Sequence, residues 1–196
     1  MLDDKYFSRP NSRQPIPADA RLVYSGKLFD VYQWEQEQYD GTKKVFEKIK
    51  RPDTVYVLPV TQDGRLLICR QTQPGSDTFY GFLGGRVESN EDILLAAKRE
   101  LYEEAGIIVS SLELWKSFQF LPKMDWAIYV FIGKDLTQCK RHLDSGEKID
   151  LVDVSLDDLF SIAGKETFGD VEIALLLLRT LTSDVEISRF KDLLGL

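Results

Sequence analysis

The sequence has little sulfur and almost no histidine. Among its 196 residues are two cysteines, Cys69 and Cys139, and one histidine, His142. Two thiols cannot build a disulfide framework and form no Cys-x-x-Cys motif, so we expect a cytoplasmic protein. A single histidine argues against a histidine-rich zinc site and against a mechanism based on histidine.

Long apolar runs and excess positive charge are also missing. Apolar runs such as the one around residues 173–178 are far too short to cross a bilayer, and the first residues lack the pattern of a signal peptide. We therefore expect no membrane contact. The net charge is −7, whereas nucleic-acid binders are more often basic, so we expect no nucleic-acid partner.

A segment of 23 residues, 85–107, carries the chemistry. It reads Gly-x5-Glu-x7-Arg-Glu-(apolar)-x-Glu-Glu-x-Gly-(apolar). In a regular helix, Glu100, Glu103 and Glu104 lie within an arc of about 100°, where like charges repel unless a cation binds. Carboxylate oxygens suit Mg²⁺, with Mn²⁺ as an alternative. The pattern predicts a divalent-metal site, whereas three clustered glutamates alone would favour a solvated acidic helix face.

Local signals mark the ends of this helix. Ser89 and Asp92 form a capping-box pattern at its start, and Gly106 fits the left-handed position that ends many helices. Ahead of the helix, Gly84-Gly85 allows a tight turn and close approach to a ligand. Arg99 lies four residues before a motif glutamate and is expected to pair with it.

The motif matches that of the Nudix hydrolases at every defined position, and the chain resembles the branch containing ADP-ribose pyrophosphatases and nucleoside diphosphate sugar hydrolases. The resemblance covers residues 45–182 well and the first 44 residues more loosely. It implies an α/β (α+β) fold, an α/β/α sandwich with a mixed sheet, preceded by an N-terminal antiparallel strand unit.

The order of elements along the chain agrees with that fold. We expect an extended or mobile arm over 1–20, three antiparallel strands over 21–49 and the Nudix domain over 50–196. Alternating and apolar patterns predict the later elements. The strands are expected at 54–61, 65–72, 112–121, 126–133 and 149–154, and the helices after the motif at 155–163, 170–181 and 184–194.

The resemblance assigns roles to individual residues. Glu100 and Glu104 are the first candidates for metal ligands, followed by Glu103, and the carbonyl of Gly84 would add another ligand. Catalysis is assigned to Glu103, Arg99 and Glu147, the last as general base or further ligand because it matches the family's loop glutamate. Asp144 and Asp150 are the alternatives to Glu147.

Three residues are candidates for substrate binding. Pro122 lies 15 residues after Ile107, a spacing typical of family members that cleave ADP-ribose. Arg51 and Arg70 resemble positions where that branch places arginines against the diphosphate, although each also fits a surface charge at a strand end. The chain departs from the branch at Gly81, where a glutamate is usual, and also at Leu83 and Gln73.

These features predict a metal-dependent hydrolase of a nucleoside diphosphate linked to another group. ADP-ribose, giving AMP and ribose 5-phosphate, or a nucleotide sugar is the expected small-molecule substrate. The alternatives are cleavage of nucleoside triphosphates or dinucleoside polyphosphates, and a module that binds nucleotides without catalysis. By analogy with the branch, the strands over 21–49 would form a homodimer contact.

Overall fold

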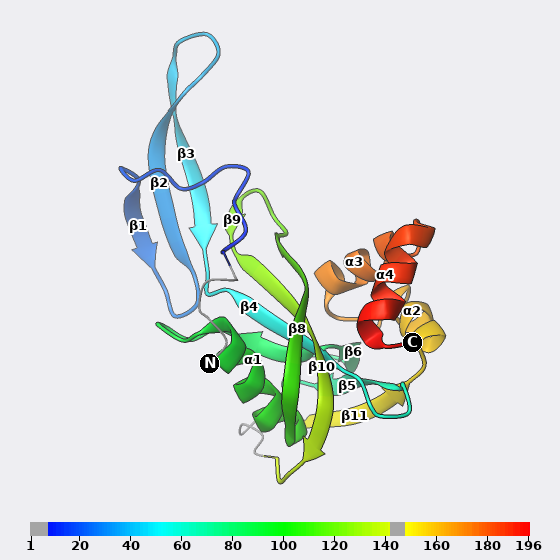
Figure 1. Ribbon diagram of the computed structural model, residues 1–196. Helices are drawn as coiled ribbons and strands as arrows, with labels where there is room; N and C mark the ends of the chain where they lie inside the picture. The colour runs from blue at the N-terminus through cyan, green and yellow to red at the C-terminus, as the bar shows by residue number, and fades with distance from the viewer. Residues whose placement is uncertain (1–7, 142–147) are drawn as a thin grey trace. The chain divides into compact units, whose positions relative to one another are not determined.

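The computed structural model describes residues 8–141 and 148–196, and the chain forms two compact units (Figure 1). Unit 1 contains the residues up to Thr54 together with 117–128, and unit 2 contains 55–116 and 129–196. Each unit combines two segments that are distant in sequence, and three strands contain residues of both units.

Unit 1 is built on an antiparallel sheet. β1 (Arg21–Ser25), β2 (Asp30–Glu37) and β3 (Lys43–Lys50) follow one another in sequence and in space, as the sequence predicts. Gly41, with a φ of +79°, makes the turn between β2 and β3. A short strand, β9 (Met124–Asp125), runs parallel to β3 at the sheet edge.

The N-terminal arm has no regular secondary structure over its described residues, but side chains of unit 1 hold it in place. The guanidinium of Arg9 donates to Asp53 and Asp125, each at 2.8 Å. The ammonium of Lys48, a buried residue, donates to the Ser12 hydroxyl and the Gln14 carbonyl, each at 2.6 Å. Burial lowers the pKa of Lys48.

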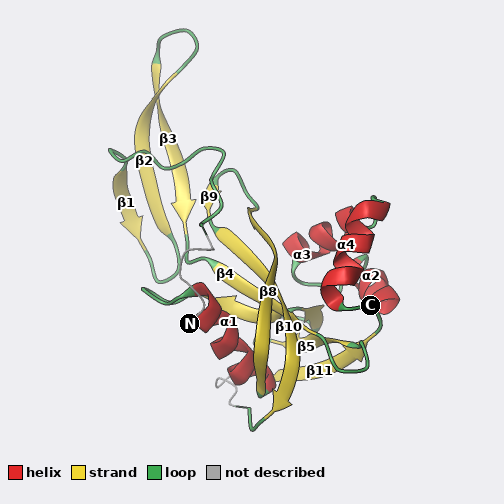
Figure 2. Ribbon diagram, in the orientation of Figure 1, coloured by secondary structure: helices red, strands yellow, loops and turns green. Residues whose placement is uncertain are grey.

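The strands of unit 2 surround the predicted motif. The strands, drawn in yellow in Figure 2, form two sheets in the orders β7-β4-β10-β8 and β11-β5-β6. The bounds are β4 (Thr54–Pro59), β5 (Leu66–Thr72), β6 (Phe79–Gly81), β7 (Leu83–Arg86), β8 (Ile107–Gln119), β10 (Ala127–Gln138) and β11 (Lys148–Val154). The sequence analysis did not predict β6 and β7, because their glycines favour a turn. Every residue of β4 is buried, which matches its continuous apolar run.

Helices lie on both sides of these strands. The motif helix consists of α1 (Ile93–Glu100) and a π-helical turn, η1 (Leu101–Ala105). On the other side are α2 (Leu156–Ala163), α3 (Val171–Thr180) and α4 (Asp184–Leu194), close to their predicted positions (Figure 1). Trp115 stacks on Phe190 with ring centroids 4.1 Å apart, which anchors α4. No helix in the described part of the chain is long and apolar enough to cross a membrane.

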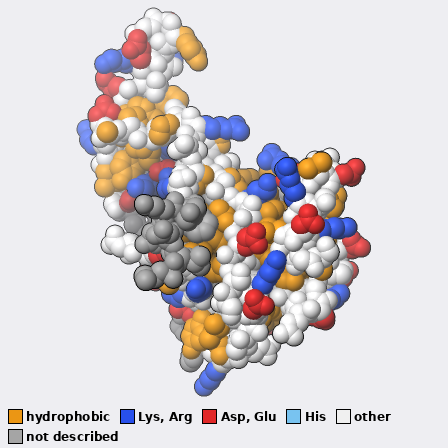
Figure 3. Space-filling view, viewed as in Figure 1, with side chains coloured by type: hydrophobic (Ala, Val, Ile, Leu, Met, Phe, Trp, Pro, Cys, Tyr) orange, Lys and Arg blue, Asp and Glu red, His pale blue; other side chains and the backbone are white. Residues whose placement is uncertain are grey.

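The strands of unit 1 expose several large apolar side chains. Figure 3 shows hydrophobic side chains gathered over the β1–β3 region. Leu22, Tyr24 and Val45 are 48%, 61% and 68% exposed, respectively. Contiguous exposed apolar patches are typical of interaction surfaces, whether for proteins, membranes or ligands.

Candidate metal and catalytic site

The turn before the motif helix accepts only glycine at its centre. Gly84 has a φ of +146°, and a Cβ atom there would lie 2.1 Å from the carbonyl oxygen of Val55. A Cβ atom on Gly85 would lie 2.6 Å from a carboxylate oxygen of Glu100. The two glycines therefore let the polypeptide backbone lie directly against the neighbouring strand and the motif carboxylates.

Two motif carboxylates lie against this turn. The N–H of Gly84 donates to Oε2 of Glu104 at 2.8 Å, and the carboxylate of Glu100 occupies the space beside Gly85. Glu104 is only 8% exposed. Charged carboxylates are rarely buried without partners, so this position favours a functional role over a solvated acidic face.

The start of the motif helix differs from the prediction. Asp92, not Ser89, is the N-cap, and its carboxylate accepts the N–H groups of Leu94 and Leu95. Asn90 has a φ of +64°, a left-handed conformation that is incompatible with a right-handed helix. The helix therefore begins after Asn90, and not directly after Ser89 as a capping box there would require. The predicted end is correct, because Gly106 takes the left-handed conformation with a φ of +63°.

The regular helix expected for all three glutamates ends at Glu100. Residues 101–105 form a π-helical turn, a feature that occurs often at functional sites. The side chain of Glu103 is 44% exposed, whereas Glu104 is buried. The two adjacent glutamates thus face different surroundings, which an argument from a uniform 100° per residue does not capture.

Arg99 organises the carboxylates around it. Its guanidinium donates to both oxygens of Glu91, to Glu100 at 2.9 Å and to Glu103 at 3.0 Å. It also donates to the carbonyl of Arg86. The hydrogen bonds to Arg99 lower the pKa of Glu91 and, in return, raise that of Arg99. The predicted pairing with Glu103 is present, but the sequence analysis missed Glu91 as the bidentate partner.

The groups around the turn include oxygen donors for a metal ion. Over residues 8–141 and 148–196, no three acidic, cysteine or histidine side chains form a ready-made metal cluster. Arg99 donates to both Glu100 and Glu103, and Glu100 and Glu104 lie against the Gly84–Gly85 turn. Two carboxylates and a backbone carbonyl are hard oxygen donors, a set that fits Mg²⁺ or Mn²⁺.

The other predicted site residues lie elsewhere. Arg70, on β5, is half-exposed and pairs with Asp150 at 3.2 Å. Arg51 and Pro122 belong to unit 1; the guanidinium of Arg51 lies 4.4 Å from the ring centroid of the buried Trp126, and Pro122 is exposed. Glu147, together with Asp144 and His142, lies outside the described residues.

A carboxyl cluster that the sequence analysis missed lies beside the turn. Oδ2 of Asp170 accepts the N–H of Phe82 at 2.8 Å, and the Tyr56 hydroxyl lies 3.2 Å from Oδ1. The same hydroxyl donates to Glu172 at 2.7 Å. Burial of its carboxyl group raises the pKa of Asp170 to about 7. The one available signal was the glycine at position 81, where the branch usually has a side chain.

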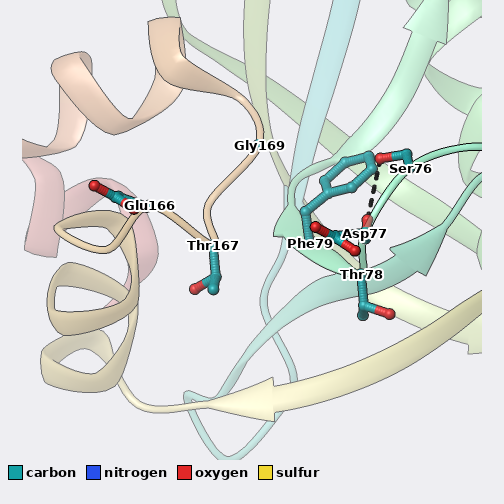
Figure 4. A pocket seen from close by; sticks show the side chains of 7 residues that line it. All are labelled: Ser76, Asp77, Thr78, Phe79, Glu166, Thr167 and Gly169. Atoms are coloured by element: carbon teal, nitrogen blue, oxygen red, sulfur yellow. Dashed lines mark hydrogen bonds between the residues drawn. The ribbon is translucent and has the colours of Figure 1, made fainter.

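An open pocket of about 570 Å³ lies at the N-terminal end of β6. Residues 76–79 line one side, and Glu166, Thr167 and Gly169 line the other (Figure 4). None of the motif glutamates contributes to it. The pocket is therefore separate from the carboxylates that would hold a metal.

Comparison with known proteins agrees with the motif and the fold. The NUDIX domain model matches residues 50–175. The ADP-ribose pyrophosphatase of Bacillus subtilis (strain 168) is 30% identical over 156 residues, which cover 78% of this chain and 84% of that protein. The methanol dehydrogenase activator of Bacillus methanolicus is 26% identical, over 69% of this chain and 76% of its own.

A solved structure also matches. The crystal structure of an ADP compounds hydrolase covers 90% of this chain with a TM-score of 0.69 and 24% identity, and the match covers 96% of that chain. The expected α+β class with mixed sheets is thereby confirmed. The matched domain and this relatedness to ADP-ribose pyrophosphatase, together with the motif at the Gly84–Gly85 turn, show that the chain belongs to the Nudix family and is a Nudix hydrolase.

Proposed function

We propose that this enzyme uses a divalent metal ion to hydrolyse the diphosphate linkage of ADP-ribose, giving AMP and ribose 5-phosphate. The placement of Glu100 and Glu104 against the Gly84–Gly85 turn carries the metal part of this proposal. The substrate is supported by the similarity to ADP-ribose pyrophosphatase. A nucleotide sugar is the second candidate, because Gly81 and Leu83 depart from the usual ADP-ribose pattern.

The chemistry follows from the charges at the site. A diphosphate repels nucleophiles, so its hydrolysis requires neutralised phosphate charge and a positioned, deprotonated water. Glu100, Glu104 and the Gly84 carbonyl would hold Mg²⁺ (Mn²⁺ as the alternative), which supplies charge neutralisation and acidifies water when bound. Arg99 orients Glu100 and Glu103 through the hydrogen bonds described above. We assign proton removal from water to Glu147 or Glu103.

Binding of the diphosphate would fall to arginines. We propose Arg51 and Arg70 for this role, with Pro122 shaping the substrate loop. Arg70 is suited to it because the side chain of its ion-pair partner Asp150 is exposed and lies 3.2 Å away, so that exchanging this surface ion pair for a phosphate costs little free energy. The guanidinium of Arg51 lies over the Trp126 ring, which fixes its direction.

We propose that the enzyme acts in the cytoplasm as a homodimer. Both cysteines are free, as expected of a reducing compartment. The exposed apolar side chains of β1–β3 support a contact between copies. Light scattering should give twice the chain mass of 22.5 kDa for the wild type and a single chain mass for Val45→Lys. The control is Val185→Lys, also at an exposed valine; a monomeric wild type would contradict the proposal.

The substrate is tested by product release from a panel. ADP-ribose, UDP-glucose, GDP-mannose, NADH, diadenosine polyphosphates and nucleoside triphosphates would be incubated with Mg²⁺ and with EDTA. We expect AMP and ribose 5-phosphate from ADP-ribose, with the highest kcat/KM of the panel, and no product in EDTA. Faster cleavage of a triphosphate or dinucleoside polyphosphate would replace the proposed substrate. Tight nucleotide binding without any turnover would favour the non-catalytic module.

A further inference from the structure

The Asp170 side chain lies in space that a side chain at position 81 would occupy. A Cβ atom on Gly81 would be 2.4 Å from Oδ2 of Asp170. The resembling branch usually has a glutamate at this position, and this chain has none. A carboxyl group is therefore still present beside the turn, but it comes from the start of α3 instead of from β6.

The conformation of Asp170 indicates a role outside its own helix. It is the residue preceding α3, and aspartate at such a position usually caps the helix with its side chain. Here no side-chain cap is formed. The carboxyl instead accepts the N–H of Phe82, the residue between β6 and β7.

Two routes connect this carboxyl to Gly84. The first is the backbone: Phe82 lies two residues before Gly84. The second is Tyr56, whose hydroxyl contacts Asp170 and whose Cα would lie 2.9 Å from a Cβ atom on Gly84. Asp170 thus contacts Phe82, the residue just before β7, which carries Gly84, and Tyr56 on β4, the strand against which Gly84 packs.

The hydroxyl of Tyr56 and the carboxyl groups of Asp170 and Glu172 form a small hydrogen-bond network. The Tyr56 hydroxyl has one hydrogen and two carboxyl neighbours, Asp170 at 3.2 Å and Glu172 at 2.7 Å. The shorter bond takes the hydroxyl hydrogen. Asp170 completes the network if its own Oδ1 carries a hydrogen and donates to the tyrosine oxygen, while its Oδ2 accepts from Phe82.

We propose that Asp170 is a positioning residue for the metal site: with Tyr56 it fixes the Phe82–Gly84 backbone, and so the Gly84 carbonyl. This rests on the proposed function in one respect, namely that the Gly84 carbonyl is a metal ligand. Residues that orient ligands from outside a metal site commonly change metal affinity by 10–100-fold when replaced.

The test is the affinity for Mn²⁺ alone, measured from the EPR signal of the free ion. We expect Asp170→Ala to weaken binding about tenfold or more, because the Phe82 N–H loses its acceptor. Asp170→Asn should stay within about threefold of the wild type, since its oxygen accepts from Phe82 and its NH₂ donates to Tyr56. Asp192→Ala, at an exposed aspartate of α4, is the matched control and should have no effect.

Two further variants distinguish an error in the proposed metal site from an error in the proposed role of Asp170. Glu104→Gln reports on the metal site itself, so equal Mn²⁺ binding by this variant and the wild type would overturn the proposed site, not the role of Asp170. Wild-type affinity in a folded Asp170→Ala would overturn the role of Asp170. If Asp170→Ala does not fold, Tyr56→Phe decides: it should weaken Mn²⁺ binding in the same direction but less, and an unchanged affinity would refute the proposal.

Discussion

Replacing Glu104 by glutamine is expected to lower kcat/KM for ADP-ribose in Mg²⁺ by about a thousandfold. The buried carboxylate accepts the Gly84 N–H at 2.8 Å, and glutamine keeps an oxygen for that bond. The fold should therefore survive, while the negative charge for the metal is lost. A metal site supplies several kcal/mol of transition-state stabilisation, and each factor of ten corresponds to about 1.4 kcal/mol.

A matched control is available on β8. Glu113→Gln removes the same charge from an exposed position in unit 2 and should leave kcat/KM unchanged. Both variants would be compared by steady-state kinetics, with circular dichroism to verify folding. A Glu104→Gln enzyme that keeps more than about a tenth of wild-type kcat/KM would remove Glu104 from the proposed metal ligands, because loss of a ligand should cost more than one factor of ten.

Short-range features of the motif were accessible from the sequence. The glycines at 84 and 85, the left-handed end at Gly106 and the pairing of Arg99 with Glu103 all depend on residues a few positions apart. Spacing and residue type are sufficient for such features, since local geometry decides them. The three C-terminal helices were located within about a residue for the same reason.

The missed features depend on contacts between distant residues or on competition between local structures. Asp170 lies 88 residues from its backbone partner Phe82 and 114 from Tyr56, so no local pattern connects them. The helix started at Asp92 instead of Ser89 because Asn90 adopted a left-handed conformation that favours a turn. The side chain of Glu103 is partly exposed and Glu104 is buried, and the π turn over 101–105 departs from the 3.6-residue spacing that the predicted arc of about 100° assumes.

Protonation of Asp170 makes stability depend on pH, and Asp170→Asn is expected to reveal it. Burial of the carboxyl group, followed by repulsion from Glu172, raises the pKa of Asp170 from 3.8 to about 7 in the folded protein. Between these values the folded state binds a proton that the unfolded state has released. The free energy of unfolding of the wild type must then fall as pH rises, because the slope follows the difference in bound protons between the unfolded and folded states.

The expected size of this effect is about 3 kcal/mol, somewhat below the full value for three pH units because Asp170 retains some contact with solvent. Asparagine cannot ionise, so the stability of Asp170→Asn relative to the wild type should increase from pH 4 to pH 7 and stay constant above it. Urea unfolding at several pH values measures the difference. The groups facing the carboxyl are Tyr56 on β4, Cys69 on β5 and Glu172 on α3.

These three neighbours affect how the free energy of unfolding should depend on pH. Tyr56 and Cys69 both have raised pKa values, chiefly through burial, so neither ionises between pH 4 and 7 and neither obscures the titration of Asp170. Glu172 repels the charged form of Asp170, so Glu172→Gln should narrow the pH range over which stability falls.

The stability difference between Asp170→Asn and the wild type could instead stay constant from pH 4 to 8, as is expected for the exposed control Asp192→Asn. This result would mean that Asp170 is already ionised in the folded protein at pH 4. The hydrogen on Oδ1 would then be absent.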